Sequence, residues 1–254
     1  MADRLNGTVA LITGASSGIG AATGLALAAQ GATVALVARR ADRLEELADQ
    51  IRGQGGTALT LVADVGDERQ AKEVVERTAT ELGRLDTLVN NAGVMLLGPA
   101  ADAPLEEWQR MVQVNVLGVL YCAHAALPYL VRAAADGPRQ VADMVNISSV
   151  AGRVARSGSG VYNLTKHGVG AFSESLRQEF AGRHVRVSLV EPGAVETELT
   201  GHNRPQIQEQ INQRFSSVER MQAEDIADAI SYIVTRPRRV AINELLVRPT
   251  EQEG

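Results

Sequence analysis

Cysteine and aromatic residues are scarce in this 254-residue chain, which has one cysteine, Cys122, and only 3% Phe, Trp and Tyr. A single cysteine can form neither an intramolecular disulfide nor an all-cysteine metal site. The four histidines show no spacing typical of metal ligands. We therefore expect no metal site.

The chain also has fewer positive than negative charges. The chain carries 25 Lys and Arg against 30 Asp and Glu, a formal net charge of −5, and has no basic run. Nucleic-acid binding usually requires a concentrated basic surface, so we expect no nucleic-acid partner. The N-terminal residues 1–7 lack the charged and then apolar order of a signal peptide.

Long hydrophobic runs are nearly missing, and the one uncharged stretch that needs explanation is 111–131. Its length would suffice for a membrane span, but Gln113, Asn115, His124 and Pro128 interrupt it. A helix buried on most of its circumference explains this pattern better. The sequence therefore predicts no membrane span and a cytoplasmic protein.

Two kinds of segment alternate along the chain, which is 45% hydrophobic and 22% charged. Short β-branched apolar runs, typical of buried strands, are 8–13, 33–38, 57–63, 85–90, 141–148, 185–190 and 241–247. Stretches of helical period are 19–30, 41–53, 67–83, 104–135, 160–182 and 223–235. This alternation predicts an α/β fold: a Rossmann-like, doubly wound parallel sheet of about seven strands in one domain, 1–254, with helices on both faces.

The segment 197–220 departs from this regularity, being rich in Gln, Asn and Arg and containing Gly201 and Pro205. Insertions at the carboxyl ends of parallel strands commonly overhang a ligand crevice. The segment is either a mobile lid over a substrate or a plain helical hairpin on the surface.

A glycine-rich loop, Thr13 to Gly20, directly follows the first expected strand and opens the first expected helix. Gly14 would allow the tight turn, Gly18 the close approach of a pyrophosphate, and Gly20 the packing of the helix on the sheet. The helix N-terminus would then present N–H groups to the phosphates. The loop thus predicts a dinucleotide site.

The end of the second expected strand, Arg39-Arg40, indicates which dinucleotide binds. An NAD site usually has an acid there to bind the ribose 2′-hydroxyl, but Asp42 comes too late and suits a helix cap. Two guanidinium groups match a 2′-phosphate instead. We therefore expect NADP.

Tyr162 and Lys166 are four residues apart in an expected helix and so lie on one face. A neighbouring ammonium favours the phenolate and would bring the pKa of the tyrosine toward neutrality, which suits proton transfer to a carbonyl. Upstream, Ser149 follows an expected strand, where its hydroxyl can bond the substrate oxygen. Asn90 to Gly93 marks another strand end on the same edge.

Together these motifs resemble the single-domain short-chain dehydrogenases/reductases over essentially the whole chain. The motifs that carry the resemblance are Thr13–Gly20, Asp64-Val65, Asn90–Gly93, Asn115, Ser149, Tyr162 with Lys166, and Pro192-Gly193 followed by Thr197. Several further segments, among them 93–99 and 244–250, are similar to the NADP-dependent 3-hydroxy acid and clavulanic acid dehydrogenases of that family.

The resemblance implies a carbonyl–alcohol oxidoreductase with Tyr162 as the acid/base. Lys166 would lower the pKa of Tyr162 and hold the nicotinamide ribose, Ser149 would polarise the carbonyl, and Asn115 would connect Lys166 to solvent. The family spacing selects Ser149 over Ser148. The implied NADP-binding residues are Gly14, Ser16, Ser17, Gly18, Ile19, Gly20, Arg39, Arg40, Asp64, Val65, Asn91, Ala92, Gly93, Tyr162, Lys166, Pro192, Gly193 and Thr197.

Two other functions stay open. A non-catalytic, redox-sensing NADP-binding regulator would typically lack the tyrosine or the lysine. A sugar-nucleotide epimerase or dehydratase would need a larger C-terminal substrate domain, for which 254 residues leave little room.

The substrate is expected to be a small molecule with an apolar contact surface at Met95, Leu96, Leu97 and Val154. Arg153 and Arg156 either capture a carboxylate or are solvated surface residues.

The helices 111–131 and 160–182 carry more apolar residues than one sheet-facing stripe needs, which indicates an interface. The expected faces contain Val112, Val116, Val119 and Ala123 on the first helix and Gly168, Val169, Phe172 and Leu176 on the second. Two such helices per subunit would pair across a two-fold axis. The resemblance implies a homotetramer rather than a dimer, with the tail 248–254 near a neighbouring subunit. Alternatively, the lid or tail covers these faces within one chain.

Overall fold

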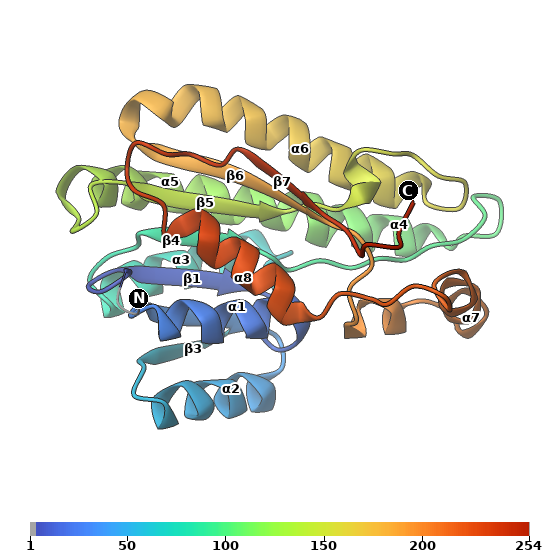
Figure 1. The fold of residues 1–254 in the computed structure, drawn as a ribbon, viewed down its shortest axis with the longest axis horizontal. Helices are drawn as coiled ribbons and strands as arrows, with labels where there is room; N and C mark the ends of the chain where they lie inside the picture. The colour runs from blue at the N-terminus through green and yellow to red at the C-terminus, as the bar shows by residue number, and fades with distance from the viewer. Residues whose placement is uncertain (1–3, 254) are drawn as a thin grey trace.

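A seven-stranded parallel sheet forms the centre of the structure, a computed structural model that describes residues 4–253 (Figure 1). Its strands are β1 (Val9–Thr13), β2 (Thr33–Ala38), β3 (Ala58–Val62), β4 (Thr87–Asn90), β5 (Ala142–Ile147), β6 (Val185–Pro192) and β7 (Glu244–Val247). Their order is β3-β2-β1-β4-β5-β6-β7, and every neighbouring pair is parallel. The predicted fold class is confirmed.

Helices cover both faces of the sheet because the central strands are apolar on both sides. Within β1, Leu11 packs into the core under one set of helices, and Ile12 packs into the core under the other. The first set is α3 (Glu68–Glu81), α5 (Gly118–Asp136) and α6 (Gly160–Phe180), and the second is α1 (Gly18–Ala29), α2 (Ala41–Gly53) and α8 (Ala223–Val234). Parallel strands buried in this way aim all their carboxyl ends at one edge, where ligands bind in such folds.

The expected helix 104–135 contains an irregularity that the sequence did not predict. It consists of α4 (Leu105–Val112), a π-helical turn (Gln113–Leu117) and α5, with the buried Asn115 at the centre of the π turn. A π turn inserts one extra residue into the helix and is frequent at functional sites. Here it turns a polar side chain inward from an otherwise apolar helix.

By length and composition, this run of Leu105–Asp136 could also cross a membrane, and 39% of its most apolar 18-residue window is buried in the molecule. Core helices of soluble proteins pass the same test. Leu130 and Cys122 of α5 lie in the core against the sheet.

Asp42 is not the cap of α2, contrary to expectation. Arg40 occupies the N-cap position, and Asp42 lies in the first turn without a capping bond. Its negative charge still interacts favourably with the helix dipole.

Part of the apolar faces expected on α5 and α6 packs inside the chain and is not available for an interface. Val119 and Val169 pack with Leu189 of β6, and Ala123 and Leu176 are buried in the main core. These side chains cover the sheet of their own chain. The outer side of α6 instead presents Leu164, which is 62% exposed, together with Gly168 and Ala171.

Candidate active site

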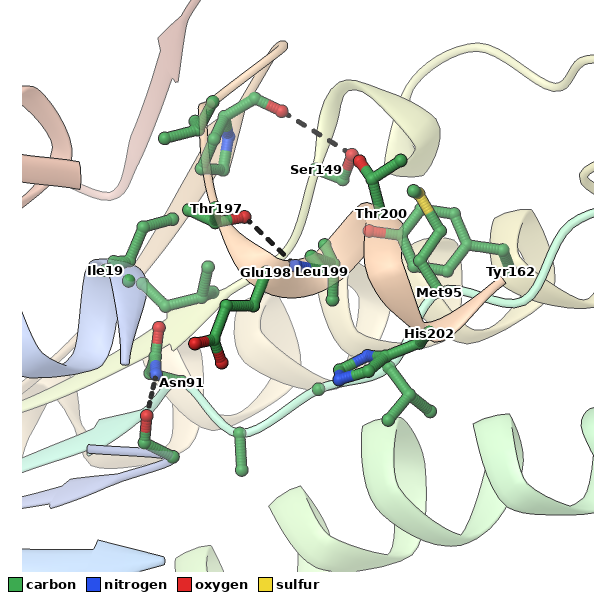
Figure 2. Close-up of a pocket in the computed structure, with 18 of the residues that line it drawn as sticks. Ile19, Asn91, Met95, Ser149, Tyr162, Thr197, Glu198, Leu199, Thr200 and His202 are labelled. Carbon is green, nitrogen blue, oxygen red and sulfur yellow. Dashed lines mark hydrogen bonds between the residues drawn. The ribbon is translucent and has the colours of Figure 1, made fainter. Parts of the chain in front are cut away.

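A cavity of about 510 Å³ is lined by the glycine loop, the ends of β2, β4, β5 and β6, the start of α6 and the segment that follows β6. Figure 2 shows Ser149, Tyr162 and Thr200 around one part of this cavity, with Ile19 and Asn91 in another part. All of the expected cofactor residues line it except Gly20, and so do all of the expected catalytic residues except Asn115.

The glycine loop adopts the conformation that its glycines were expected to permit. Gly14 and Gly18 have φ angles of +68° and +53°, which L side chains rarely adopt. A Cβ on Gly20 would clash with the carbonyl oxygen of Gly14. The N-terminus of α1 therefore lies at the cavity with Ser17 as its N-cap, and the Ser17 side chain makes no capping bond.

Thr13 and Asn91 fix the glycine loop to the end of β4. The Asn91 side chain donates to the Thr13 carbonyl oxygen at 2.9 Å, and the backbone N–H groups of Asn91 and Ala92 donate to the Thr13 hydroxyl at 3.0 and 3.1 Å. The Asn91 amide thus positions the loop. Thr13 belongs to the loop motif recognised in the sequence, but its role as an anchor for the chain after β4 could not be predicted there.

Arg40 contacts both serines of the glycine loop. Its guanidinium donates to the Ser16 hydroxyl at 3.0 Å and to the Ser17 hydroxyl at 2.8 Å, and it pairs with Glu198 at 2.9 Å. Arg39 makes a longer contact, with its guanidinium 3.9 Å from the carboxylate of Asp64. The carboxylate of Glu198, which the sequence analysis did not single out, thus contacts Arg40 where a ribose 2′-phosphate is expected to bind.

Replacing both Arg39 and Arg40 by Gln should reduce the preference for NADPH over NADH at least about tenfold, because charge-assisted hydrogen bonds contribute strongly to phosphate recognition. The comparison of dissociation constants for the two cofactors measures this. Glu198→Gln should shift the preference the other way, since it removes a competing carboxylate from Arg40. An unchanged ratio in the double variant would mean that the phosphate is recognised elsewhere.

Ser149, Tyr162 and Lys166 converge at the start of α6. Tyr162 and Lys166 are buried side chains one turn apart, and the Lys166 ammonium lies 5.8 Å from the centre of the Tyr162 ring. Lys166 donates to the carbonyl oxygen of Ile147 at 2.8 Å. The Ser149 hydroxyl donates to the carbonyl oxygen of Pro192 at 3.5 Å and accepts from the N–H of Ala151 at 3.1 Å, and its proximity to the Tyr162 hydroxyl favours the phenolate. The three residues therefore lie together on one side of the cavity.

Burial dominates the protonation of this group. It raises the pKa of Tyr162 to about 12, opposed by the hydrogen bond from Ser149, and lowers the pKa of Lys166 to about 8. The expectation that Lys166 brings the pKa of Tyr162 toward neutrality is therefore wrong for this structure. A buried hydroxyl loses hydration on ionising, and Ser149 is the side chain that opposes this effect.

The side chains of Ser148 and Asn115 form hydrogen bonds with backbone groups of the protein. The Ser148 hydroxyl donates to the carbonyl oxygen of Lys166 at 3.1 Å, which is consistent with Ser149 as the reactive serine. The Asn115 amide donates to the Val94 carbonyl oxygen and accepts from the Val94 N–H, both at 2.8 Å. Asn115 thus positions the chain after β4 from behind the cavity surface. Its expected link from Lys166 to solvent stays a prediction.

Asp64 and Val65 lie beside the expected adenine end of the cavity. The Asp64 carboxylate accepts from the N–H of Gly66 at 2.9 Å, which fixes the turn after β3.

The segment 197–220 lies over the cavity. It forms a 3-10 helix (Glu198–His202) and α7 (Pro205–Arg214), which Figure 1 shows beyond the end of the sheet. Thr197 caps the 3-10 helix, and a Cβ on Gly18 would lie 3.1 Å from its side chain. Asn203 accepts from the N–H of Leu97 at 2.7 Å, which connects the segment to the chain after β4.

The C-terminal tail contacts the site of its own chain. Gln252 lines the cavity and accepts from the N–H of Ala194 at 2.8 Å, and Glu251 accepts from the N–H of Glu219 at 2.9 Å. Gly193 fits beneath Gln252 because it has no side chain.

Arg153 and Arg156 have different environments. Arg153 lies at the surface, with its side chain 41% exposed, and forms ion pairs with Glu191, at 2.6 Å, and with Glu244, so it is not an open anion site. Arg156 lines the cavity. Of the expected apolar contacts, Met95 and Leu97 line the cavity, whereas Leu96 is buried in the core outside the lining and Val154 is exposed.

These residues fit a dinucleotide with a 2′-phosphate. The glycines leave space that side chains would fill, and the N-terminus of α1 faces the cavity. Arg40 lies beside the loop, where it donates hydrogen bonds to two hydroxyls and pairs with one carboxylate.

Comparisons with known proteins match this geometry. The sequence model of the family described as short chain dehydrogenase matches residues 8–208. Sulfoacetaldehyde reductase 2 of Chromohalobacter salexigens is 38% identical over 96% of this chain and 95% of its own length. Glycine betaine reductase ATRR of Emericella nidulans is 39% identical over 98% of this chain, but the chain spans only 19% of that longer protein.

Among solved structures, the closed form of a serine dehydrogenase complexed with NADP+ superposes with a TM-score of 0.88. It is 32% identical, and the match covers 97% of both chains.

Proposed function

The chain belongs to the short chain dehydrogenase family, and from that premise we propose that it interconverts a small carbonyl compound and its alcohol with NADP(H) as cofactor. One observation carries the proposal: the glycine loop with Arg40 and the group Ser149, Tyr162 and Lys166 line the same cavity. The names of a sulfoacetaldehyde reductase and of an NADP+-bound serine dehydrogenase support it.

The residues divide the reaction as follows. When bound, NADPH supplies the hydride. The hydroxyls of Ser149 and Tyr162 hold the carbonyl oxygen, and Tyr162, kept protonated by its burial, donates the proton that completes the alcohol. The ammonium of Lys166, held by Ile147, stabilises the phenolate that remains.

Absorbance of the reduced nicotinamide, followed with a panel of aldehydes, ketones and hydroxy acids, tests the proposal. We expect substrate-dependent oxidation of NADPH and faster turnover with NADPH than with NADH. Tight NADPH binding without turnover of any substrate would instead favour the redox-sensing regulator. Conversion of a sugar nucleotide without net change in absorbance would favour the epimerase or dehydratase.

We also propose that the protein is a homotetramer, or at least a dimer, with α6 at an interface. Leu164 is exposed on α6 beside the small residues Gly168 and Ala171, and apolar surface of this kind favours association. The tail contacts its own site, so the tail–neighbour contact is not part of this proposal.

Light scattering at micromolar concentration should give two or four times the 27.0 kDa mass of one chain. Leu164→Arg should lower that mass by placing charge in the contact, whereas Val62→Arg, at another exposed apolar residue, should leave it unchanged. A mass of one chain for the parent protein would refute the interface.

We further propose a cytoplasmic location, because the long apolar run has its core-facing residues packed against the sheet. Recovery of the protein in washed membranes after cell fractionation would contradict it.

A further inference from the structure

Arginines outside the expected cofactor contacts also line the cavity. Arg156, Arg214 and Arg220 all line the cavity. The backbone N–H of Arg156 donates to the Asn163 side chain at 3.2 Å, which places Arg156 beside the first turn of α6, next to Tyr162. Arg214 and Arg220 lie 5.5 and 5.8 Å from the ring of Phe215.

These arginines concentrate positive charge without neutralising acids. The pKa of Arg156 is lowered by burial and by the positive charges of Arg214 and Arg248. Within residues 4–253, no carboxylate lies within ion-pair distance of Arg156 or Arg214, whereas Arg40 and Arg153 both have such partners. Uncompensated positive charge at a cavity attracts and orients an anion.

The phosphates of the cofactor do not account for this cluster. They are expected at the N-terminus of α1 and at Arg40, which belong to the other part of the cavity. Arg156 instead comes from the loop between Ser149 and Tyr162, where the reacting carbon must lie.

The cavity also limits the size of the substrate. Met95, Val114, Leu199, Ile211 and Phe215 give it apolar surfaces, and its volume of about 510 Å³ must be shared with the cofactor. This apolar lining suits a short aliphatic chain.

Building on the proposed function, we propose that the substrate is a short aliphatic carbonyl or hydroxy compound with a terminal carboxylate or sulfonate, bound by Arg156 and Arg214. The sequence suggested Arg153 and Arg156 as possible ligands of a carboxylate. In this proposal Arg156 binds the anion, whereas Arg153 forms ion pairs within the protein.

Pairs of substrates with the same reactive group but different charge test the proposal. Succinic semialdehyde and sulfoacetaldehyde carry the anion, and butanal does not. We expect kcat/KM to be at least about tenfold higher for an anionic aldehyde than for butanal, a ratio typical of one charge-assisted contact. The response of the two anionic aldehydes distinguishes carboxylate from sulfonate.

Arg156→Gln and Arg214→Gln should each reduce this preference at least about tenfold, mainly through KM for the anionic aldehydes. Arg156→Lys should retain part of it. Arg43→Gln is the matched control, because it removes the same charge from an exposed position on α2.

Calorimetric titration of succinate into the complex with NADP+ provides a readout without turnover. Binding that weakens in Arg156→Gln and not in Arg43→Gln supports the proposal. If butanal is reduced as well as the anionic aldehydes, and the variants leave that ratio unchanged, the anion site is overturned while the proposed function stands. If no aldehyde is reduced, the titration alone decides on the anion site. The site is overturned if succinate does not bind, or if it binds equally well to the parent protein and to Arg156→Gln.

Discussion

Tyr162→Phe is expected to lower turnover at least about 100-fold while NADPH binding stays within about twofold of the parent protein, because positioned proton transfer contributes about 10²–10⁴-fold to such rates. The substitution removes only the hydroxyl oxygen, and the buried ring keeps its packing with Met111, Val94 and Leu96. The proton donor is lost, and the buried Ser148 hydroxyl at the cavity does not replace it, because that hydroxyl already donates to the carbonyl oxygen of Lys166.

Single-turnover oxidation of NADPH measures the chemical step, and quenching of Trp108, the only tryptophan, measures cofactor binding. Tyr232→Phe is the matched control, because Tyr232 is 51% exposed and lies outside the cavity. Turnover by Tyr162→Phe at more than a few per cent of the parent rate would exclude Tyr162 as the acid.

Gly20→Ala is expected to weaken NADPH binding at least about 100-fold and to lower the free energy of unfolding by about 1–3 kcal/mol, as overpacking typically does. The new Cβ would clash with the Gly14 carbonyl oxygen and the Asn91 amide, and it would lie 2.8 Å from the Gly14 carbonyl carbon. Backbone atoms cannot yield as a flexible side chain would. The loop must move away from α1, and the alignment of its N–H groups with the phosphates is lost.

Gly53→Ala makes the same chemical change at the end of α2, where a Cβ would meet nothing within 4 Å. It should leave NADPH binding unchanged and stabilise the protein by at most about 1 kcal/mol, through helix propensity. Thermal unfolding with and without NADPH measures both variants. Equal NADPH affinity in Gly20→Ala and Gly53→Ala would mean that the contact between loop and helix does not position the cofactor.

Local patterns in the sequence were sufficient to predict the strands and helices and much of the site. The strand and helix ranges follow from apolar periodicity, and the structure places each expected strand within a few residues of its prediction. The glycine loop and the pair Tyr162 and Lys166 could also be recognised, because a tight turn and one helical turn are short-range geometry. In each case the residues that define the feature are neighbours in the chain.

Contacts between distant parts of the chain could not be predicted from the sequence and were found only in the tertiary structure. Glu198 pairs with Arg40 across more than 150 residues, Arg153 is neutralised by Glu191 and Glu244, and Arg156 is left for another anion. The sequence offered Arg153 and Arg156 as equivalents, because their spacing carries no information about which carboxylates pack beside them.

Burial likewise depends on packing. The pKa of Tyr162 rises because the surrounding residues bury its hydroxyl, and Val119 and Val169 are covered because they pack with Leu189 of β6. The sequence by itself determined which segments form strands and helices and which short motifs carry chemistry, since short-range geometry depends on neighbours in the chain. The tertiary structure decided which charges are paired, which apolar faces are covered and how the catalytic groups hold their protons, because those depend on the surroundings that packing creates.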